Sequence, residues 1–246
     1  MPSREERASS LNAQQVALRD CTACSLSLKR TQVVFGVGDA AAEIMFVGEG
    51  PGFHEDKQGE PFVGQAGKLL SELLATIGLR REDVYIANVV KCRPPDNRDP
   101  LASEIEACSP NLLEQVRTIR PRVICTLGRF ATRLIGETDA PISSVRGRAK
   151  SMEVAGVPVM VFPVFHPAAA LYTPSNRALL EEDLRKLKLL LDRDRKALTS
   201  QEDEYVAEVA AVPDEHVAKA EITVASGTVG DDGRSGGERA EQLPLW

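Results

Sequence analysis

Residues 43–52 read EIMFVGEGPG, an apolar run that passes directly into a loop of glycine, glutamate and proline. A short apolar run bounded by turn residues predicts a buried strand that enters a loop. Residues 84–90 (VYIANVV) and residues 122–127 (RVICTL) repeat the pattern. Residues 151–164 predict two further strands around a turn at Gly156, the second of them strongly apolar.

Helices are predicted between these strands. Residues 66–78 carry leucine and isoleucine at helical spacing and end at Gly78, a residue typical of helix ends. Strands that alternate with helices favour an α/β fold. We therefore predict three layers, α/β/α, around a central, mainly parallel sheet of four strands. The other predicted helices are a short one that ends at Ile135 and those at residues 11–20, 103–119 (with Pro110 as a candidate break) and 175–195.

The charge of the chain changes sharply near residue 196. The whole chain has 30 basic and 36 acidic residues, but residues 197–246 hold three of the bases and eleven of the acids. We predict a globular domain over residues 1–196 and an acidic tail over residues 197–246 that is mostly disordered between 199 and 241. The N-terminus lacks an apolar signal core and no apolar run is long enough to cross a bilayer, so we expect a cytoplasmic monomer with no membrane partner.

Two groups of basic residues are candidates for contact with a nucleic acid. One is Arg93 with Arg98, and the other is Arg146 with Arg148 and Lys150. Clustering of this kind can provide an electrostatic footprint for a phosphate backbone. Ordinary solvated surface charge explains any one of these residues equally well.

Five cysteines in a chain without a signal peptide do not suggest disulfides. Cys21 and Cys24 form a C-x2-C pair, and Cys92 and Cys108 each stand beside turn-forming residues. If these four thiolates converge, they can hold either zinc or a [4Fe–4S] cluster, and their spacing does not choose between the two. Cys125 lies inside an apolar strand, so we expect it to be a buried structural thiol.

Ligands of open α/β sheets bind at the carboxyl ends of the strands, where the first predicted strand delivers its glycine-rich loop. The backbone N–H groups of such a loop can approach a ligand closely, although many loops of this kind are only turns. Glu49 and Glu55 add carboxylates that could orient water. Phe62 stands in Pro-Phe-Val-Gly within a polar loop, where its ring can stack on a planar base or simply pack against the loop.

Two later strand ends add further polar candidates. The second strand ends near Asn88, whose side chain offers a donor and an acceptor. That pair matches the O4 and N3–H edge of uracil and mismatches the amino group of cytosine. The last strand ends at His166, one of three histidines in the chain, which precedes Pro167. A histidine at a strand terminus is a candidate functional group.

Taken together, these residues resemble the family 4 uracil-DNA glycosylases, from about residue 21 to residue 193. The motifs that carry the resemblance are Cys21-Thr-Ala-Cys24, Gly48-Glu-Gly-Pro-Gly52 with Glu55-Asp56 and Pro61-Phe-Val-Gly64, Asn88 through Cys92-Arg-Pro-Pro with Asn97, and His166-Pro-Ala-Ala169. The complete set of motifs in this order identifies the family far more specifically than any single motif does. The predicted fold is therefore uracil-DNA glycosylase-like.

The resemblance implies a [4Fe–4S] cluster on Cys21, Cys24, Cys92 and Cys108 rather than zinc, with a structural role because hydrolysis needs no electron. It also implies that uracil binds in one pocket. There Phe62 would stack on the base, Asn88 would read its edge and His166 would lie near O2. Further pocket positions are matched by Gly50, Glu55 and Asn97.

The mechanism implied by the resemblance begins when deoxyuridine flips out of DNA into this pocket. His166 and the glycine loop would stabilise the negative charge on the departing uracil. Glu49 is the leading candidate to orient water, with Glu55 as the alternative. We also expect a monofunctional enzyme that leaves an abasic site and does not cut the backbone.

The sequence departs from the family pattern after His166-Pro167, where alanines replace the usual serine-containing stretch. The residue that fills the emptied base stack is therefore open, with Leu171 and Tyr172 as candidates. The alternatives from other classes of protein are an iron–sulfur protein that binds nucleic acid without catalysis and a zinc-dependent nucleotide hydrolase. The set of pocket residues argues against the first, and the lack of a metal-ligand cluster of histidine and carboxylates argues against the second.

The chain ends in Gln242-Leu243-Pro244-Leu245-Trp246, an apolar cluster after a polar, acidic tail. The pentapeptide resembles the short peptides by which bacterial repair and replication proteins dock on the sliding clamp. Its leucines and tryptophan would fill an apolar groove, and the long linker would raise the effective concentration of the enzyme near DNA. The alternatives are that the peptide folds back on the catalytic domain or that the match is due to chance.

Overall fold

A computed structural model describes residues 2–210, with side chains described up to residue 193. The chain divides into two compact units, Met1–Ala197 and Leu198–Trp246. The pentapeptide at 242–246 and the predicted tail beyond residue 210 lie outside the described residues.

The first unit is built on one six-stranded sheet with the order β1-β3-β2-β4-β6-β5. The four inner strands, β3, β2, β4 and β6, are parallel, and each edge strand pairs antiparallel with its neighbour. The α/β class is therefore confirmed, whereas the sheet has two more strands than the four predicted. The strands span Val37–Gly38 (β1), Ile44–Gly48 (β2), Tyr85–Asn88 (β3), Val123–Leu127 (β4), Lys150–Val154 (β5) and Val157–Val164 (β6).

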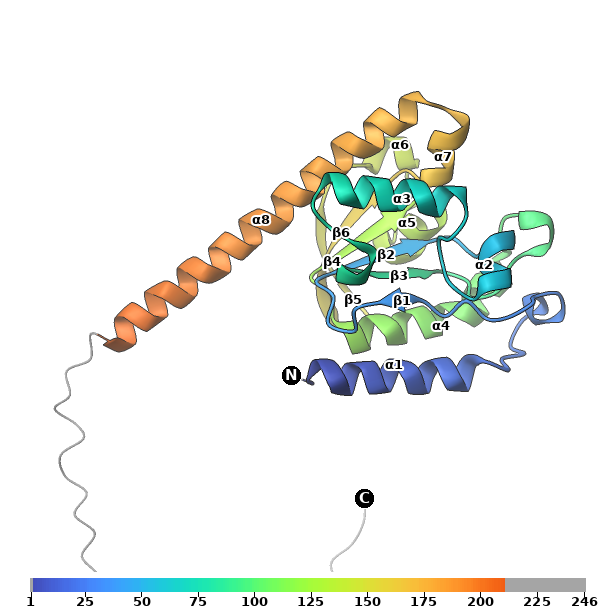
Figure 1. The fold of residues 1–246 in the computed structure, drawn as a ribbon, viewed down its shortest axis with the longest axis horizontal. Helices are drawn as coiled ribbons and strands as arrows, with labels where there is room; N and C mark the ends of the chain where they lie inside the picture. The colour runs from blue at the N-terminus through green and yellow to red at the C-terminus, as the bar shows by residue number, and fades with distance from the viewer. Residues whose placement is uncertain (1, 211–246) are drawn as a thin grey trace, which may run out of the picture. The chain divides into compact units, whose positions relative to one another are not determined.

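The sheet separates two apolar cores, because successive side chains of a strand point to opposite faces. In β2, Met45 and Val47 join the core that contains residues of α1, α4 and α5. Ile44 and Phe46 join the core that contains residues of α3, α7 and α8. Figure 1 shows α1 and α4 on one side of the sheet and α3 on the other. The predicted three layers are therefore present.

Three helices differ from their predicted ranges. α1 begins at Arg4, seven residues early, because Ser3 accepts a hydrogen bond from the Glu6 N–H while the Glu6 carboxylate accepts one from the Ser3 N–H. α4 continues through Pro110, since its buried face packs in the core on both sides of that residue. α8 runs on to Ala210 because residues 196–210 are rich in good helix formers.

The sequence did not predict the shortest elements, which have too few residues to show a period. Two of them, α2 and α7, flank the predicted ligand loops. The helices span Arg4–Leu18 (α1), Phe53–Gln58 (α2), Gln65–Thr76 (α3), Ala102–Ile119 (α4), Arg129–Gly136 (α5), Ile142–Val145 (α6), Pro167–Tyr172 (α7) and Ser175–Ala210 (α8), with 3-10 turns at Ser25–Leu28 (η1), Arg81–Asp83 (η2) and Pro95–Asn97 (η3).

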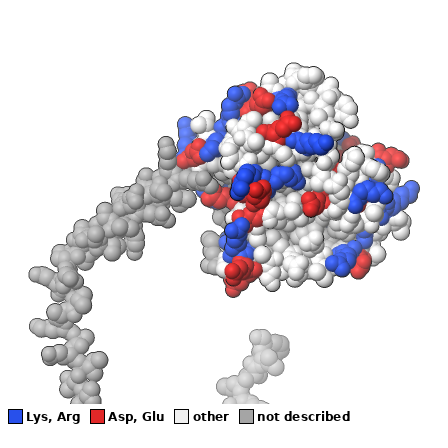
Figure 2. Space-filling view, viewed as in Figure 1, with Lys and Arg blue, Asp and Glu red and all other residues white. Residues whose placement is uncertain are grey.

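In the described residues, no helix combines the length and the apolar character that crossing a bilayer requires. On the face shown in Figure 2, basic and acidic side chains are interspersed. Arg146, one of the predicted basic cluster, forms an ion pair at 2.8 Å with Asp183, which is fully buried in α8. It also donates to the Leu179 carbonyl at 2.7 Å. This arginine therefore holds α8 against the loop after α6.

Candidate active site and cysteine cluster

A cavity of about 360 Å³ opens at the carboxyl ends of the parallel strands. Residues from the loop after β2, the end of β3, η3 and the start of α7 line it. The structure brings every predicted pocket residue to this one cavity, although these residues span more than a hundred positions of sequence. They are Glu49, Gly50, Glu55, Phe62, Asn88, Asn97 and His166.

Asn88 is the last residue of β3 and lies beside Gly48 of β2 in the sheet register. Its side chain is 2% exposed, and its Oδ1 has no hydrogen-bond partner among the described residues. A buried acceptor without a partner costs free energy, so such an atom in a cavity wall indicates a donor on a ligand. A Cβ at Gly48 would lie 2.5 Å from this oxygen, which explains the need for glycine there.

Phe62 lines the cavity and is buried. The ring is stacked on His166 with the centroids 5.5 Å apart and an interplanar angle of 28°. A Cβ at Gly48 would come within 2.6 Å of the same ring, so the glycine admits Phe62 as well as Asn88. The aromatic ring, the amide and the imidazole are therefore gathered at the end of β2.

His166 is the N-cap residue of α7, and its Nδ1 accepts a hydrogen bond from the Ala168 N–H at 3.1 Å. Burial lowers the pKa of His166 to about 4, while the charge of Glu55 acts in the opposite direction. The imidazole is therefore neutral at physiological pH. Because Nδ1 is an acceptor, the proton of the neutral ring resides on Nε2, which can donate to a ligand.

The two candidate carboxylates differ in their surroundings. Burial raises the pKa of Glu49 to about 7, with a further increase from Asp99 that Arg129 opposes. Glu55 uses Oε1 to accept hydrogen bonds from the N–H groups of Val63 at 3.0 Å and Gly64 at 2.8 Å. Glu55 therefore already supports the loop, whereas Glu49 is poised to exchange a proton near neutral pH.

Exposed apolar side chains belong to a residue that lines the cavity and to direct chain neighbours of lining residues. Tyr172 lines it and is 87% exposed, and Leu171 beside it is 46% exposed. Phe53, at the start of α2, is 49% exposed, and the Arg93 guanidinium lies 5.2 Å from the centre of its ring. Arg93 also donates to Oδ1 of Asn97 at 2.8 Å. The rim therefore combines apolar rings with positive charge, a combination that suits nucleic-acid bases and phosphates.

Four cysteines from three separate segments line one small pocket beside the N-terminal helix. Cys21 and Cys24 follow α1, Cys92 follows β3, and Cys108 belongs to α4; none of the described cysteines forms a disulfide. Cys125 lies apart from them, fully buried in β4. No group of three metal-binding side chains in the described part of the chain has the spacing for a single metal ion.

Two of these sulfurs accept hydrogen bonds. Arg30 donates to Sγ of Cys92 at 3.4 Å, and the backbone N–H of Lys91 donates to Sγ of Cys108 at 3.3 Å. Four free cysteines with such donors form a set that fits an iron–sulfur cluster, because thiolates bind the iron and N–H groups stabilise the sulfurs.

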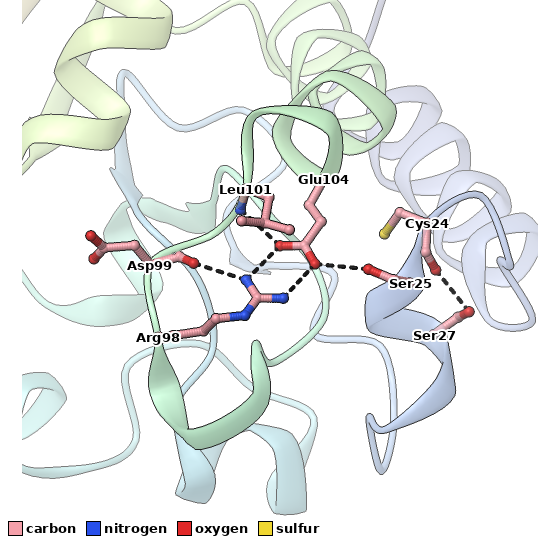
Figure 3. A network of polar contacts seen from close by, with 7 residues as sticks. All are labelled: Cys24, Ser25, Ser27, Arg98, Asp99, Leu101 and Glu104. Atoms are coloured by element: carbon pink, nitrogen blue, oxygen red, sulfur yellow. Dashed lines mark hydrogen bonds and ion pairs between the residues drawn. The ribbon is translucent and has the colours of Figure 1, made fainter.

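Glu104, which no sequence pattern indicated, connects the cysteine segment to the loop that borders the cavity. Its carboxylate is 1% exposed and accepts two hydrogen bonds from Arg98, at 2.7 and 2.8 Å, and one from Ser25 at 2.8 Å (Figure 3). The hydrogen bond from Arg98 is the main reason why the pKa of Glu104 falls to about 2. Arg98, a candidate DNA-contacting residue, is therefore committed to this ion pair.

Lys91 is a second buried residue that the sequence did not single out. Its Nζ donates to the Asn88 carbonyl at 3.0 Å and to Oε1 of Gln115 at 2.6 Å. Gln115 in turn donates to the Phe35 carbonyl at 3.0 Å. The end of β3, which carries Asn88, is therefore fixed to α4. A lysine within an otherwise apolar run was the available signal.

Comparisons with known proteins identify the family to which this chain belongs. A family model described as "Uracil DNA glycosylase superfamily" matches residues 35–188, and this chain belongs to that superfamily. Within it, the relatives place the chain with the type-4 uracil-DNA glycosylases, which confirms the resemblance found in the motifs.

Three of these relatives are named type-4 uracil-DNA glycosylase. That of Archaeoglobus fulgidus is 49% identical over 185 residues, which cover 74% of this chain and 93% of the relative. That of Saccharolobus solfataricus is 51% identical over 176 residues, or 70% of this chain and 82% of the relative. That of Thermotoga maritima is 47% identical over 180 residues, or 72% of this chain and 92% of the relative.

Proposed function

We propose that this chain is a uracil-DNA glycosylase that hydrolyses the bond between uracil and deoxyribose in base excision repair. The observation that carries the proposal is the buried Asn88 Oδ1, unpaired among the described residues, in a cavity with an aromatic ring and a neutral histidine. Curated relatives of that name share about half of their aligned residues with this chain. Release of free uracil from a uracil-containing oligonucleotide, but not of thymine from a matched control, tests it.

Uracil recognition follows from the chemistry of one amide. Oδ1 of Asn88 accepts from the N3–H of uracil, and its NH₂ group donates to O4. Cytosine presents an unprotonated N3 and an amino group at the corresponding positions, so both contacts become mismatched. Phe62 supplies a flat surface for stacking on the base, a contact worth about 1–3 kcal/mol.

His166 is proposed to stabilise the departing base. Cleavage of the glycosidic bond leaves negative charge on uracil and positive character on the sugar. The Nε2–H of a neutral imidazole donates to O2 as that charge develops, and it holds its position because Nδ1 is fixed by the Ala168 N–H. Backbone N–H groups of the loop around Gly50 assist.

Glu49 is proposed to orient the attacking water, with Glu55 as the alternative. The hydrogen bonds from Val63 and Gly64 to Glu55 favour Glu49, since Glu55 has one oxygen already engaged. No lysine is among the described residues that line the cavity, so the chain offers no amine there for a covalent sugar adduct. The expected product is an abasic site in an intact backbone.

The deoxyuridine must leave the duplex to reach this cavity. Tyr172 and Leu171, which are exposed at its rim, are the candidates to fill the gap in the base stack. Phe53 with Arg93 stands on the rim as a further surface for a neighbouring base and its phosphate.

A [4Fe–4S] cluster is proposed to be held by Cys21, Cys24, Cys92 and Cys108. The four free thiols around one pocket and the N–H donors to two of them support it. When bound, the cluster supplies a cross-link between the segment after α1, the loop after β3 and α4. No step of the hydrolysis requires an electron, so the cross-link is the whole of its role.

Asn88→Asp is expected to weaken uracil excision by about 10- to 100-fold, the scale of losing one donor and leaving a buried group unpaired. The ionised side chain only accepts hydrogen bonds, so it opposes O4 of uracil and matches the amino group of cytosine. Single-turnover excision from matched uracil and cytosine oligonucleotides measures both changes. Asn12→Asp on the exposed side of α1 is the control, and full uracil activity of Asn88→Asp would remove Asn88 as the edge reader.

The pH dependence of excision is expected to report Glu49. With its pKa raised to about 7, the carboxylate is protonated at lower pH and cannot orient water as a base. The single-turnover rate should therefore rise with pH and level off above about 7. His166, with its pKa near 4, stays neutral throughout this range. Glu49→Gln should lower the single-turnover rate and remove this pH dependence. An unchanged dependence of the rate on pH in that variant would assign the orientation of water to Glu55 instead.

Docking on a sliding clamp through Gln242-Trp246 stays a prediction, because the pentapeptide lies outside the described residues. Deletion of residues 242–246 should abolish binding to the cognate clamp and leave excision on short DNA intact. Equal clamp binding by the shortened chain would contradict the prediction. Loss of excision would instead favour folding of the peptide onto the catalytic domain. The domain division at residue 196, the monomeric state and the cytoplasmic location are likewise predictions.

A further inference from the structure

The backbone of Phe62 adopts an uncommon conformation. Its φ angle is 55°, in the left-handed region that bulky side chains rarely occupy. The residue lies in the short connection between α2 and α3, in the stretch Pro61-Phe62-Val63-Gly64. A residue holds such a conformation only when its surroundings fix it, and strain of this kind gathers at functional sites.

The N–H groups that follow Phe62 are held by one carboxylate. Oε1 of Glu55 accepts hydrogen bonds from Val63 at 3.0 Å and from Gly64 at 2.8 Å. Glu55 belongs to α2, so this contact fixes the loop to the helix that precedes it.

The carbonyl groups on the other side are held by one guanidinium. Arg81 donates from Nη1 to the Phe62 carbonyl at 3.0 Å and from Nη2 to the Pro61 carbonyl at 2.8 Å. Arg81 stands in η2, just before β3, and is half-buried. The planar fork of arginine suits two adjacent carbonyls, which a single ammonium group cannot engage with the same geometry.

Helix α3 closes the space behind the loop. A Cβ at Gly67 would lie 1.8 Å from the Phe62 carbonyl oxygen, so the helix backbone lies directly against this peptide group. The Phe62 carbonyl is thus confined between α3 and Arg81, and the ring is directed toward Gly48 and His166.

We propose that Arg81 is a positioning residue that holds the Phe62 ring in its base-stacking orientation by binding the carbonyls of Pro61 and Phe62. This inference rests on the proposed function, in which Phe62 stacks on uracil. Arg81 is not among the residues that line the cavity, so it acts through the loop. Glu55 provides the matching support on the N–H side.

Free uracil is the probe that isolates this effect, because it fills the pocket without the rest of the DNA. Arg81→Met should weaken inhibition by free uracil about 10-fold. A change of this size corresponds to a large part of the affinity that stacking on one base is expected to provide. The KM for uracil-containing DNA should rise by a similar factor, with a smaller change in kcat, since the ring contacts the base before and during bond cleavage.

A double-mutant cycle with Phe62→Ala tests whether Arg81 acts through the ring. Arg81→Met should add nothing to the loss already caused by Phe62→Ala. Arg81→Lys, which keeps the charge and one donor, should recover part of the affinity for uracil. Arg80→Met is the matched control, because Arg80 is exposed and bonds only to Glu82 and Asp83 in the described contacts.

Two results would overturn the proposal. One is unchanged inhibition by uracil in a folded Arg81→Met protein. The other is a loss that adds in full to that of Phe62→Ala, since this would show that Arg81 acts elsewhere. Excision by the wild-type chain is measured in the same series, so a failure of the proposed function is distinguished from a failure of this inference.

Discussion

His166→Ala is expected to lower the single-turnover rate of uracil excision by about 100-fold or more, the scale of losing one donor that stabilises developing charge. The structure supplies the reason. The ring is neutral because burial lowers its pKa to about 4, and Nδ1 accepts from the Ala168 N–H, so Nε2 carries the proton. A neutral donor of fixed direction stabilises the charge on the departing uracil more than it stabilises the bound substrate. Removal of the donor therefore slows the chemical step.

The measurement uses saturating enzyme, so that DNA binding does not limit the rate. His54→Ala is the control, since His54 is exposed on α2 and does not line the cavity; its rate should stay within about 2-fold of wild type, as for surface substitutions away from a site. An unchanged rate for His166→Ala would exclude the histidine from the mechanism. His166→Gln should recover part of the rate, because its amide also has a donor.

Cys92→Ser is expected to abolish the proposed cluster and to destabilise the fold. The wild-type chain, purified without oxygen, should be brown and carry about four irons, as four thiolate ligands of one cluster imply. Without the cluster, the segment after α1, the loop after β3 and α4 lose their common cross-link. A fall of roughly 10 °C in Tm is expected, because a loss of a few kcal/mol lowers the Tm of a domain of this size by about 2–4 °C per kcal/mol.

Cys125→Ser is the matched control, since this thiol is also buried but lies in β4, apart from the other four. It should keep its iron and its colour. Colourless wild-type protein with one zinc per chain would contradict the cluster, and full iron content in Cys92→Ser would remove Cys92 from the ligand set. Iron analysis and visible absorption decide both questions without reference to activity.

The central strands were predictable because each is a short apolar run that ends in turn residues. Parallel strands then bring their carboxyl ends to one edge, so Glu49, Asn88 and His166 meet although they are far apart in sequence. The edge strand β1 was missed because two residues carry no pattern. Pro110 was a misleading signal, since burial of α4 against the sheet outweighs one lost hydrogen bond.

The residues that support the site were not predictable in the same way. Three supporting residues act through hydrogen-bond partners that lie between 3 and 79 positions away in the sequence: Arg81, Glu104 and Lys91. Their roles depend on contacts formed in the folded chain, which the periodic pattern of apolar residues does not reveal. Glu55 is the clearest example. Its sequence position suggests a catalytic carboxylate, whereas its hydrogen bonds to Val63 and Gly64 show a structural use as well.

Excision of uracil from an end-labelled oligonucleotide tests the central claim most directly. The purified full-length chain should release free uracil from a strand with one deoxyuridine and leave an abasic site. The labelled strand should stay intact until alkali cleaves it at that position, because the described residues that line the cavity include no lysine that could cut the backbone. Strand scission without alkali would contradict the monofunctional mechanism, and absence of released uracil from protein that carries its iron would contradict the proposed function itself.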